Sequence, residues 1–236
     1  FPLDETMLAA TSPGAIVADE SAVLTGVDAE GLVAVASGAG ATIEFRVGVG
    51  TFVPAGAVIA VASGGAPVDA QAVRSACTWG LERTLRADVA YGFRMLVDVA
   101  ERSLADSPFL DPSTAVQAID RLHDGLRQLT CRDLGNGTYR GSDGRVRVTV
   151  PTMDWNDFVH LAFDEIRLAG SGSPQVSRRM TAALLDLIEV APEERRAALR
   201  EQLELLHAAI SAGSRADADK AYATEPDTQG IGVRRR

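Results

Sequence analysis

The sequence is poor in lysine, cysteine and aromatic residues, and each shortage excludes a class of function. Its 236 residues contain a single lysine, Lys220, so chemistry that needs a lysine amine in the folded part of the chain is excluded. Cys77 and Cys131 are far apart and fall on apolar helical patterns, which indicates small core residues and not a disulfide or a metal site. Aromatic residues make up only 5% of the chain, so a core must be built mainly from alanine, valine and leucine.

Long apolar runs and catalytic signatures are missing as well. No apolar run reaches 18 residues, so no segment is expected to span a bilayer. The nucleophile elbow of hydrolases, the P-loop and the dinucleotide-binding glycine motif are absent. The net charge is −9 and the basic residues form no stripe, so we do not expect nucleic acid as a partner. His123, His160 and His207 lie on different predicted helices without metal-ligand spacing, so we predict no metal site and no cofactor.

Residues 15–66 have the composition of a small, glycine-rich β domain. Short runs rich in valine, isoleucine and alanine alternate with glycines, which predicts strands of about five residues joined by glycine turns. One of these predicted strands is LVAVA at 32–36. The segment VGVGTFVPAGAVIAV at 47–61 resembles the hairpin of biotinyl- and lipoyl-type barrel-sandwich domains. Those carriers hold their cofactor on a lysine, and no lysine precedes Lys220, so only a barrel-sandwich-like architecture is expected.

Beyond residue 66 the apolar period becomes helical. A stripe from Val73 to Leu104 predicts one long helix, which Gly80 and Gly92 interrupt. Asp111-Pro112 predicts the start of the next helix, with the aspartate as its N-cap. Further helices are predicted to begin near Asp154, Ser173-Pro174 and Pro192. The predicted fold class is therefore α+β, with these parts: a leader (1–14), a β domain (15–66), a helical domain (67–213) that carries one β-hairpin near 138–150, and a tail (214–236) that we expect to be disordered.

Ionisable residues concentrate between residues 83 and 120, in two predicted helices and their connection. Their plainest explanation is a solvated ridge of ion pairs, each contributing a few tenths of a kcal/mol, together with a cap at the second helix. The alternative is a polar site between the helices, in which Asp88 or Asp111 acts as a base or as a cation ligand. The candidate residues for this site are Arg83, Asp88, Arg94, Asp98, Arg102, Asp111, Thr114 and Asp120.

The same stretch carries a resemblance to a known family. The matching elements are Arg83-Thr84, Asp88, Tyr91-Gly92-Phe93, Asp98 with Ala100 and Arg102, Asp111-Pro112 with Thr114-Ala115, Asp164-Glu165-Ile166-Arg167, and Gln175-Val176 with Arg178-Arg179. On these residues the sequence resembles domain of unknown function 2254, a family of predicted bacterial membrane proteins. The family pattern has an asparagine before the Asp-Pro pair, whereas this sequence has Leu110.

The resemblance implies an extramembrane part of a bacterial integral membrane protein whose transmembrane helices lie upstream of Phe1. We expect it at the cell membrane, on the cytoplasmic side, since its cysteines are unpaired. The expected role is non-enzymatic, in assembly, gating or partner binding, and the expected state is a homo-oligomer. Two alternatives stay open: a hydrolase-type enzyme with its Asp/Arg site around 83–120, and a module that senses a small molecule through the β domain.

Overall fold

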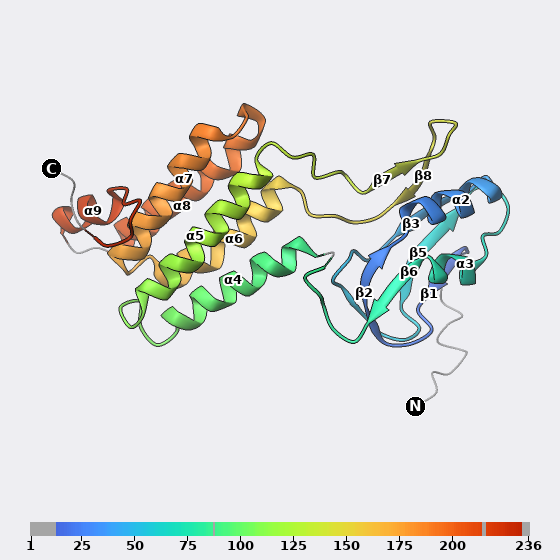
Figure 1. Cartoon of the computed structure of the whole chain (residues 1–236), viewed down its shortest axis with the longest axis horizontal. Coiled ribbons are helices and arrows are strands. Elements are labelled where there is room, and N and C mark those ends of the chain that lie inside the picture. The colour runs from blue at the N-terminus through green and yellow to red at the C-terminus, as the bar shows by residue number, and fades with distance from the viewer. Residues whose placement is uncertain (1–12, 87, 214–215, 233–236) are drawn as a thin grey trace. The chain divides into compact units, whose positions relative to one another are not determined.

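The computed structural model describes residues 13–86, 88–213 and 216–232 (Figure 1). It divides the chain into two compact units, each built from two stretches of sequence. The β unit consists of the residues up to Tyr91 together with Gly135–Thr152. The helical unit consists of Gly92–Leu134 together with the residues from Met153 onward. The predicted α+β class is therefore confirmed.

The β unit contains two sheets. Its strands are β1 (Ala15–Val17), β2 (Ala22–Val27), β3 (Thr42–Phe45), β4 (Phe52–Val53), β5 (Val58–Ser63), β6 (Cys77–Gly80), β7 (Thr138–Arg140) and β8 (Val146–Thr149). The larger sheet has the order β1-β5-β3-β8-β7, and the smaller sheet has the order β4-β2-β6. Neighbouring strands are antiparallel except β3 and β8, which pair in parallel. The segment 47–61 thus contributes β4 to one sheet and the start of β5 to the other, and its likeness to a barrel-sandwich hairpin stays a prediction.

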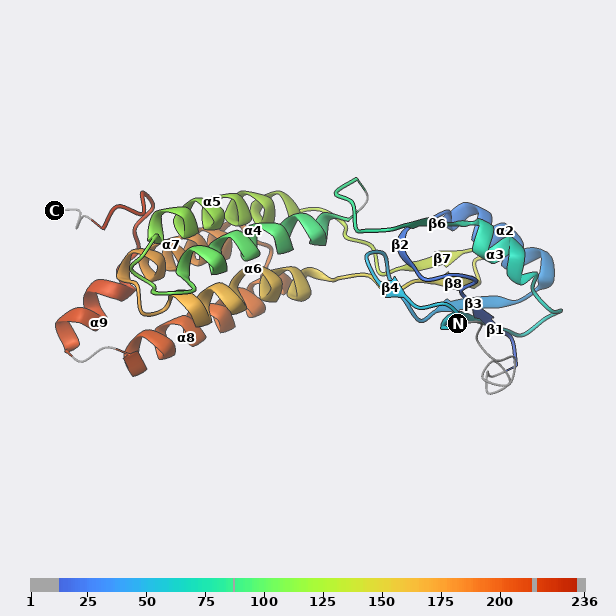
Figure 2. The same ribbon diagram turned by 90° about the horizontal axis from the view of Figure 1, so that it is seen from below.

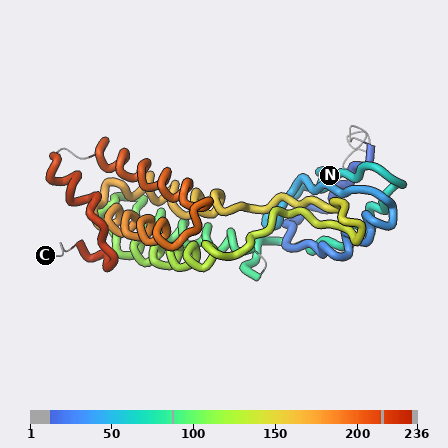
Figure 3. Tube along the Cα trace, turned by 90° about the horizontal axis from the view of Figure 1, so that it is seen from above, coloured from blue at the N-terminus to red at the C-terminus, as the bar shows by residue number. Residues whose placement is uncertain are grey.

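A β-hairpin is present where the sequence predicts one, but it belongs to the β unit. Strands β7 and β8 enclose the predicted Asp143-Gly144 turn, in which Gly144 adopts φ +75°. Strand β8 then pairs with β3, with Val148 opposite Ile43. Figure 3 shows this yellow hairpin beside the blue strands of the β unit. The sequence predicts this hairpin within the helical domain. That placement is wrong because the sequence shows a hairpin but not the distant strand that pairs with it.

The predicted strand at 32–36 is wrong, since these residues lie within helix α2 (Ala29–Ala39). Asp28 caps the helix by accepting a hydrogen bond from the Gly31 amide at 3.0 Å. Gly40 ends it in the left-handed conformation, with φ +64°. Leu32 and Ala36, one turn apart, are the buried residues. A short apolar run fits a buried helix as well as a buried strand, and here the caps at the two ends decide the outcome.

The single helix predicted from Val73 to Leu104 is also wrong. The structure has helix α3 (Ala70–Ser75), then strand β6, and then helix α4 (Val89–Leu104). Strand β6 pairs with β2, with Trp79 opposite Leu24 and Gly80 opposite Val23. Thr78 and Trp79 favour strands, and pairing with a distant strand overrides the helical spacing of their neighbours.

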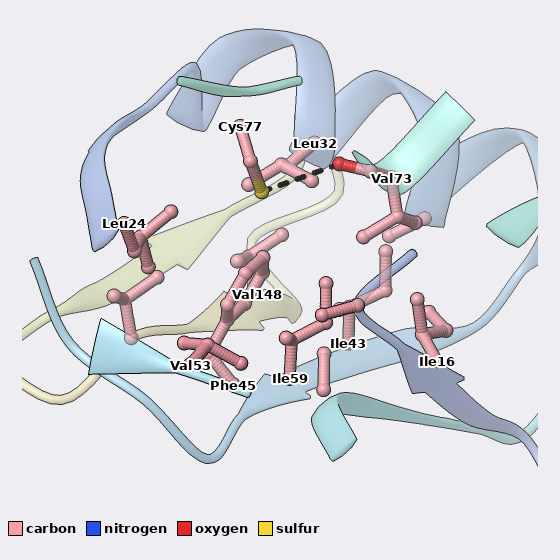
Figure 4. Packing of buried hydrophobic residues seen from close by; sticks show 14 residues of the cluster. Ile16, Leu24, Leu32, Ile43, Phe45, Val53, Ile59, Val73, Cys77 and Val148 are labelled. Atoms are coloured by element: carbon pink, nitrogen blue, oxygen red, sulfur yellow. Dashed lines mark hydrogen bonds between the residues drawn. The ribbon is translucent and has the colours of Figure 1, made fainter. Parts of the chain in front are cut away.

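The core of the β unit is formed by aliphatic side chains from both of its sequence stretches. Val148 and Val150 of the second stretch pack with residues of the first, including Leu24, Ile43 and Ile59 (Figure 4). Cys77 belongs to this cluster, and its thiol donates a hydrogen bond to the carbonyl oxygen of Val73 at 3.4 Å. Burial raises the pKa of Cys77 to about 11, so the thiol stays protonated. Cys77 is thus the small core residue that the sequence predicts, although it lies in a strand and not in a helix. The same prediction for Cys131 is wrong, because Cys131 is exposed.

The helical unit contains most of α4 and the helices that follow it. These are α5 (Pro112–Leu129), α6 (Trp155–Gly170), α7 (Pro174–Val190), a 3₁₀ turn (Glu193–Arg195), α8 (Arg196–Gly213) and α9 (Asp217–Thr224). Helices α4 to α8 run lengthwise beside one another (Figure 2). Helix α9 lies in the stretch that we expected to be disordered, and it packs on α7 and α8 with Ala223 buried. None of the described helices is long and apolar enough to cross a membrane.

Local signals explain where these helices begin. Asp154 and Asp157 form a capping box at the start of α6, each side chain accepting a hydrogen bond from the other residue's amide. Proline occupies the first turn of α5 and of α7. Close packing between helices comes from small residues: a Cβ on Gly125 would lie 2.9 Å from the ring of Phe93. Phe93 in turn packs edge-on against Phe158, with ring centroids 5.3 Å apart.

Candidate functional site

Asp88 is the most enclosed of the candidate residues and belongs to the β unit. Its side chain is only 7% exposed, and its Oδ2 lies 2.8 Å from Nε and 2.7 Å from Nη2 of Arg83. The other oxygen, Oδ1, accepts a hydrogen bond from the Tyr91 amide at 2.9 Å and so caps α4. The Arg83 guanidinium also lies over the Tyr91 ring, 5.1 Å from its centroid. Both oxygens of Asp88 are therefore engaged by groups of the same unit.

A glycine makes room for this ion pair. Gly50 has φ +90°, and a Cβ at this position would lie 2.5 Å from Oδ2 of Asp88 and 2.7 Å from Nη2 of Arg83. The Gly50 amide donates to the Leu24 carbonyl oxygen at 2.7 Å, which holds the loop against β2. The loop after β3 is thus shaped to accept the Arg83–Asp88 pair, which fastens the segment before α4 to the β unit.

Arg94, Asp98 and Arg102 do share one side of α4, as their spacing predicts, but the three residues are not equivalent. Arg94 contacts three carboxylates: Asp98 and Glu101 on its own helix and Glu165 on α6. We call these four residues the Arg94 cluster. Arg102 stands outside it, with 77% of its side chain exposed and its guanidinium 4.0 Å from Asp98. The cluster joins α4 to α6 through the pairing of Arg94 with Glu165.

The Arg94 cluster has an excess of negative charge, because one guanidinium faces three carboxylates. Burial and the neighbouring Glu165 raise the pKa of Glu101, and Arg94 opposes this shift. Arg94 holds its proton more firmly than usual, because the hydrogen bonds that it donates to Glu165 and Asp98 outweigh the effect of burial on its pKa. The guanidinium fills the space between the carboxylates. Among the described residues, no group of three or more His, Cys, Asp or Glu side chains could hold a metal ion.

Asp111 and Thr114 form a helix cap. Asp111 Oδ1 accepts a hydrogen bond from the Thr114 amide at 3.1 Å, at the start of α5. Hydrogen bonds from the side chain and the backbone of Thr114 lower the pKa of the Asp111 carboxyl, which is fully exposed. The interpretation of Asp-Pro as a capping pair is confirmed, and a carboxylate in this role is a weak base.

Asp120 belongs to a network between α5 and α7 that sequence reasoning did not find. Asp120 accepts a hydrogen bond from Arg179 Nε at 2.6 Å, and Arg179 Nη2 lies 2.9 Å from Nδ1 of His123. The other ring nitrogen of His123, Nε2, lies 2.8 Å from Asp186, which also pairs with Arg127. We call these five residues the Arg179 network. Positions 120, 123 and 127 have the spacing of one helix face, which is the local signal that could have suggested it.

The chemistry of the Arg179 network fixes the tautomer of His123. A guanidinium can only donate, so Nδ1 accepts from Arg179, and Nε2 carries the hydrogen that it donates to Asp186. Burial would raise the pKa of Asp186, but hydrogen bonds from Arg127 and His123 outweigh it and the pKa is lowered. Both ring nitrogens of His123 are occupied, so neither is free to take a proton from a nucleophile.

All the candidate residues except Arg102, which stays exposed, thus belong to one of four features: the ion pair in the β unit, the Arg94 cluster, the cap of α5 or the Arg179 network. The protein is therefore of the α+β class, and most of these ionisable groups either cap a helix or join one helix to another. Comparison with known families agrees with the resemblance that the sequence motifs predict. The family model described as predicted membrane protein (DUF2254) matches residues 3–186, and the chain belongs to this family.

The curated relatives extend this finding without naming an activity. An uncharacterized protein of Mycobacterium bovis and two uncharacterized proteins of Mycobacterium tuberculosis are each 33% identical over 147 residues. These matches cover 60% of the present chain and 26% of each relative. The chain therefore spans about a quarter of the length of the curated relatives that it matches. No solved structure matches it at a significant level.

Proposed function

We propose that this chain is a non-enzymatic extramembrane domain that assembles a membrane protein through contact between two copies of itself. One observation carries the proposal: the carboxylates that could have served catalysis are used to cap helices or to join them. Asp88 and Asp111 cap α4 and α5, while Asp98 and Asp120 pair with arginines. A hydrolase-type site is disfavoured on the same ground, since the His123 imidazole has no free nitrogen.

The outer face of α4 offers a contact surface for assembly. Met95 and Val99 are 44% and 43% exposed, and Arg102 continues the same face one turn further along. Beside Val99 lies a depression of about 220 Å³ between α4 and α5, lined by Leu96, Thr114 and other residues. Met95 and Val99 are one turn apart on the same helix face, and contiguous exposed apolar side chains mark interaction sites.

A second copy is the partner that this face suits best, because its charges are self-complementary. Asp98 and Arg102 are one turn apart on α4. When two copies of α4 lie antiparallel about a two-fold axis between these residues, each Arg102 approaches the other copy's Asp98. The depression beside Val99 can then accept an apolar side chain of the other copy. The family's membrane nature supports the extramembrane role, and the unpaired cysteines support the cytoplasmic side.

Sedimentation velocity over a range of concentrations tests this proposal. The unchanged chain is expected to form a dimer, and Val99→Glu is expected to weaken it by at least about tenfold in Kd, since it places a charge in an apolar contact. Leu168→Glu is the matched control, because Leu168 is an exposed leucine on α6, with 71% of its surface accessible. A chain that stays monomeric at every concentration, or a dimer that responds equally to both substitutions, would refute assembly through α4.

A further inference from the structure

A cavity in the β unit, lined by none of the candidate site residues described above, has a lining suited to a ligand. Its volume is about 300 Å³, at the lower end of the range for small-molecule sites. The turn between β1 and β2, helix α3 and strand β6 each supply part of its wall. The residues that give it chemical character are Asp19, Glu20, Gln71, Arg74, Ser75 and Trp79.

The charge balance of this cavity is negative. Arg74 lies 2.8 Å from Asp19 through Nε, and it donates to Gln71 Oε1 at 2.9 Å and to the Val17 carbonyl oxygen at 3.5 Å. Its guanidinium is therefore neutralised by Asp19 and directed at protein acceptors. Glu20 makes no ion pair with any described residue, so no positively charged side chain among them balances its charge. An anionic ligand would meet this uncompensated carboxylate, which argues against phosphate or carboxylate compounds.

Trp79 adds an aromatic side chain to the lining that contains the Glu20 carboxylate. Trp79 is half-buried in β6, where its pairing with Leu24 of β2 fixes its backbone. The thiol of Cys77, also in the wall, stays protonated and adds no charge. Tryptophan is the side chain with the strongest cation–π attraction, and proteins recognise quaternary ammonium groups with aromatic side chains.

We propose that this cavity binds a small organic ammonium ion, with the cationic head between the Trp79 ring and the Glu20 carboxylate. Arg74 and Asp19 form the fixed wall that joins α3 to the β1–β2 turn. The volume accommodates a molecule of a few carbon atoms bearing one ammonium group. This site is independent of the proposed assembly through α4, because all of its residues belong to the β unit.

Isothermal titration with pairs of isosteric probes tests the proposal on the full chain. Choline and butylamine are expected to bind saturably, and their uncharged counterparts, 3,3-dimethylbutan-1-ol and butan-1-ol, at least about tenfold more weakly. Glu20→Gln should weaken choline by about tenfold, since it removes the charge from an exposed side chain without disturbing the fold. Trp79→Leu should weaken it by a similar factor.

Glu30→Gln is the control, because it removes an exposed carboxylate from α2 of the same unit. No saturable binding of either ammonium probe would overturn the proposal. Equal affinity for the uncharged probes would overturn it too, and so would a Glu20→Gln variant that binds choline as well as Glu30→Gln does. A Trp79→Leu variant that fails to fold leaves the test with Glu20→Gln intact.

Discussion

Replacing Asp88 should separate the two structural roles of its carboxylate. Asp88→Ala removes both the cap of α4 and the partner of Arg83, whereas Asp88→Asn keeps an oxygen that can cap but turns an amide toward the guanidinium. The cap contributes about 1 kcal/mol. Breaking a buried ion pair costs about 3–5 kcal/mol, but Arg83 is 34% exposed and water can reach it, so we expect roughly 2 kcal/mol here. Asp88→Ala should thus lose roughly 3 kcal/mol and Asp88→Asn roughly 2 kcal/mol.

The two tryptophans of the chain make the measurement specific to one unit. Trp79 lies in the β unit and Trp155 in the helical unit. In a Trp155→Phe background, the fluorescence of Trp79 during urea unfolding reports the β unit alone. Each variant is compared with the parent in that background, and the free energy of unfolding is taken from the midpoint at constant m-value.

Asp28→Ala is the matched control for the cap. Asp28 caps α2 in the same unit, is exposed and has no arginine partner among the described residues, so its loss should cost only about 1 kcal/mol. A loss for Asp88→Ala no larger than that for Asp28→Ala would contradict this prediction, because the Arg83 pair would then contribute nothing. Equal losses for Asp88→Asn and Asp88→Ala would instead show that the cap contributes nothing.

Two further predictions concern the helical unit and use Trp155 fluorescence in a Trp79→Phe background. Asp111→Ala should lower the urea midpoint, because it removes the cap of α5, and Asp111→Asn should leave the midpoint almost unchanged, because asparagine caps as well as aspartate; a large loss with Asn would mean that the charge itself matters. Arg94→Met should make stability fall more steeply than in the parent as the pH rises above the ordinary range of a glutamate carboxyl. Burial and Glu165 already raise the pKa of Glu101. A carboxyl group whose pKa is higher in the folded than in the unfolded protein stabilises the fold fully below its unfolded pKa, and this stabilisation is lost as pH rises through the folded pKa. Removing Arg94 raises the folded pKa of Glu101 further, because Arg94 opposes the shift. Parallel pH profiles in the two proteins would contradict this.

The parts of the fold that could be predicted are those with local causes. The starts of α5 and α6 follow from Asp111-Pro112 and from the aspartate at 154, whose capping hydrogen bonds reach only three residues along the chain. The strand predicted at 32–36 failed because Leu32 and Ala36 suit either kind of buried element. Strand β6 was missed because its partner β2 is distant in sequence, and no local sequence pattern predicts such a pairing.

The contacts of the candidate residues could likewise be predicted only where the partner is close in sequence. Asp111 as a cap could be predicted, since its partner Thr114 is three residues away. Arg94 and Glu165 are 71 residues apart, and Asp120 and Arg179 are 59 apart. Their pairing depends on which helices pack together, which the sequence pattern of each helix leaves open. The motif match to the family contained both Glu165 and Arg179, but it could not say which residues they contact.

The parallel pairing of β3 with β8 has a consequence for how this chain is synthesised. Ile43 leaves the ribosome well before its partner Val148, and all of α4 and α5 is translated in between. During that interval one edge of β3 is unpaired, and an open strand edge is prone to join other chains. Helices α4 and α5 also lack their packing partners in α6 to α8 during this interval, because those helices are translated only after the hairpin. Neither unit can be completed before the other has begun, so a nascent chain stalled before the hairpin holds two unfinished units and is a natural substrate for chaperones.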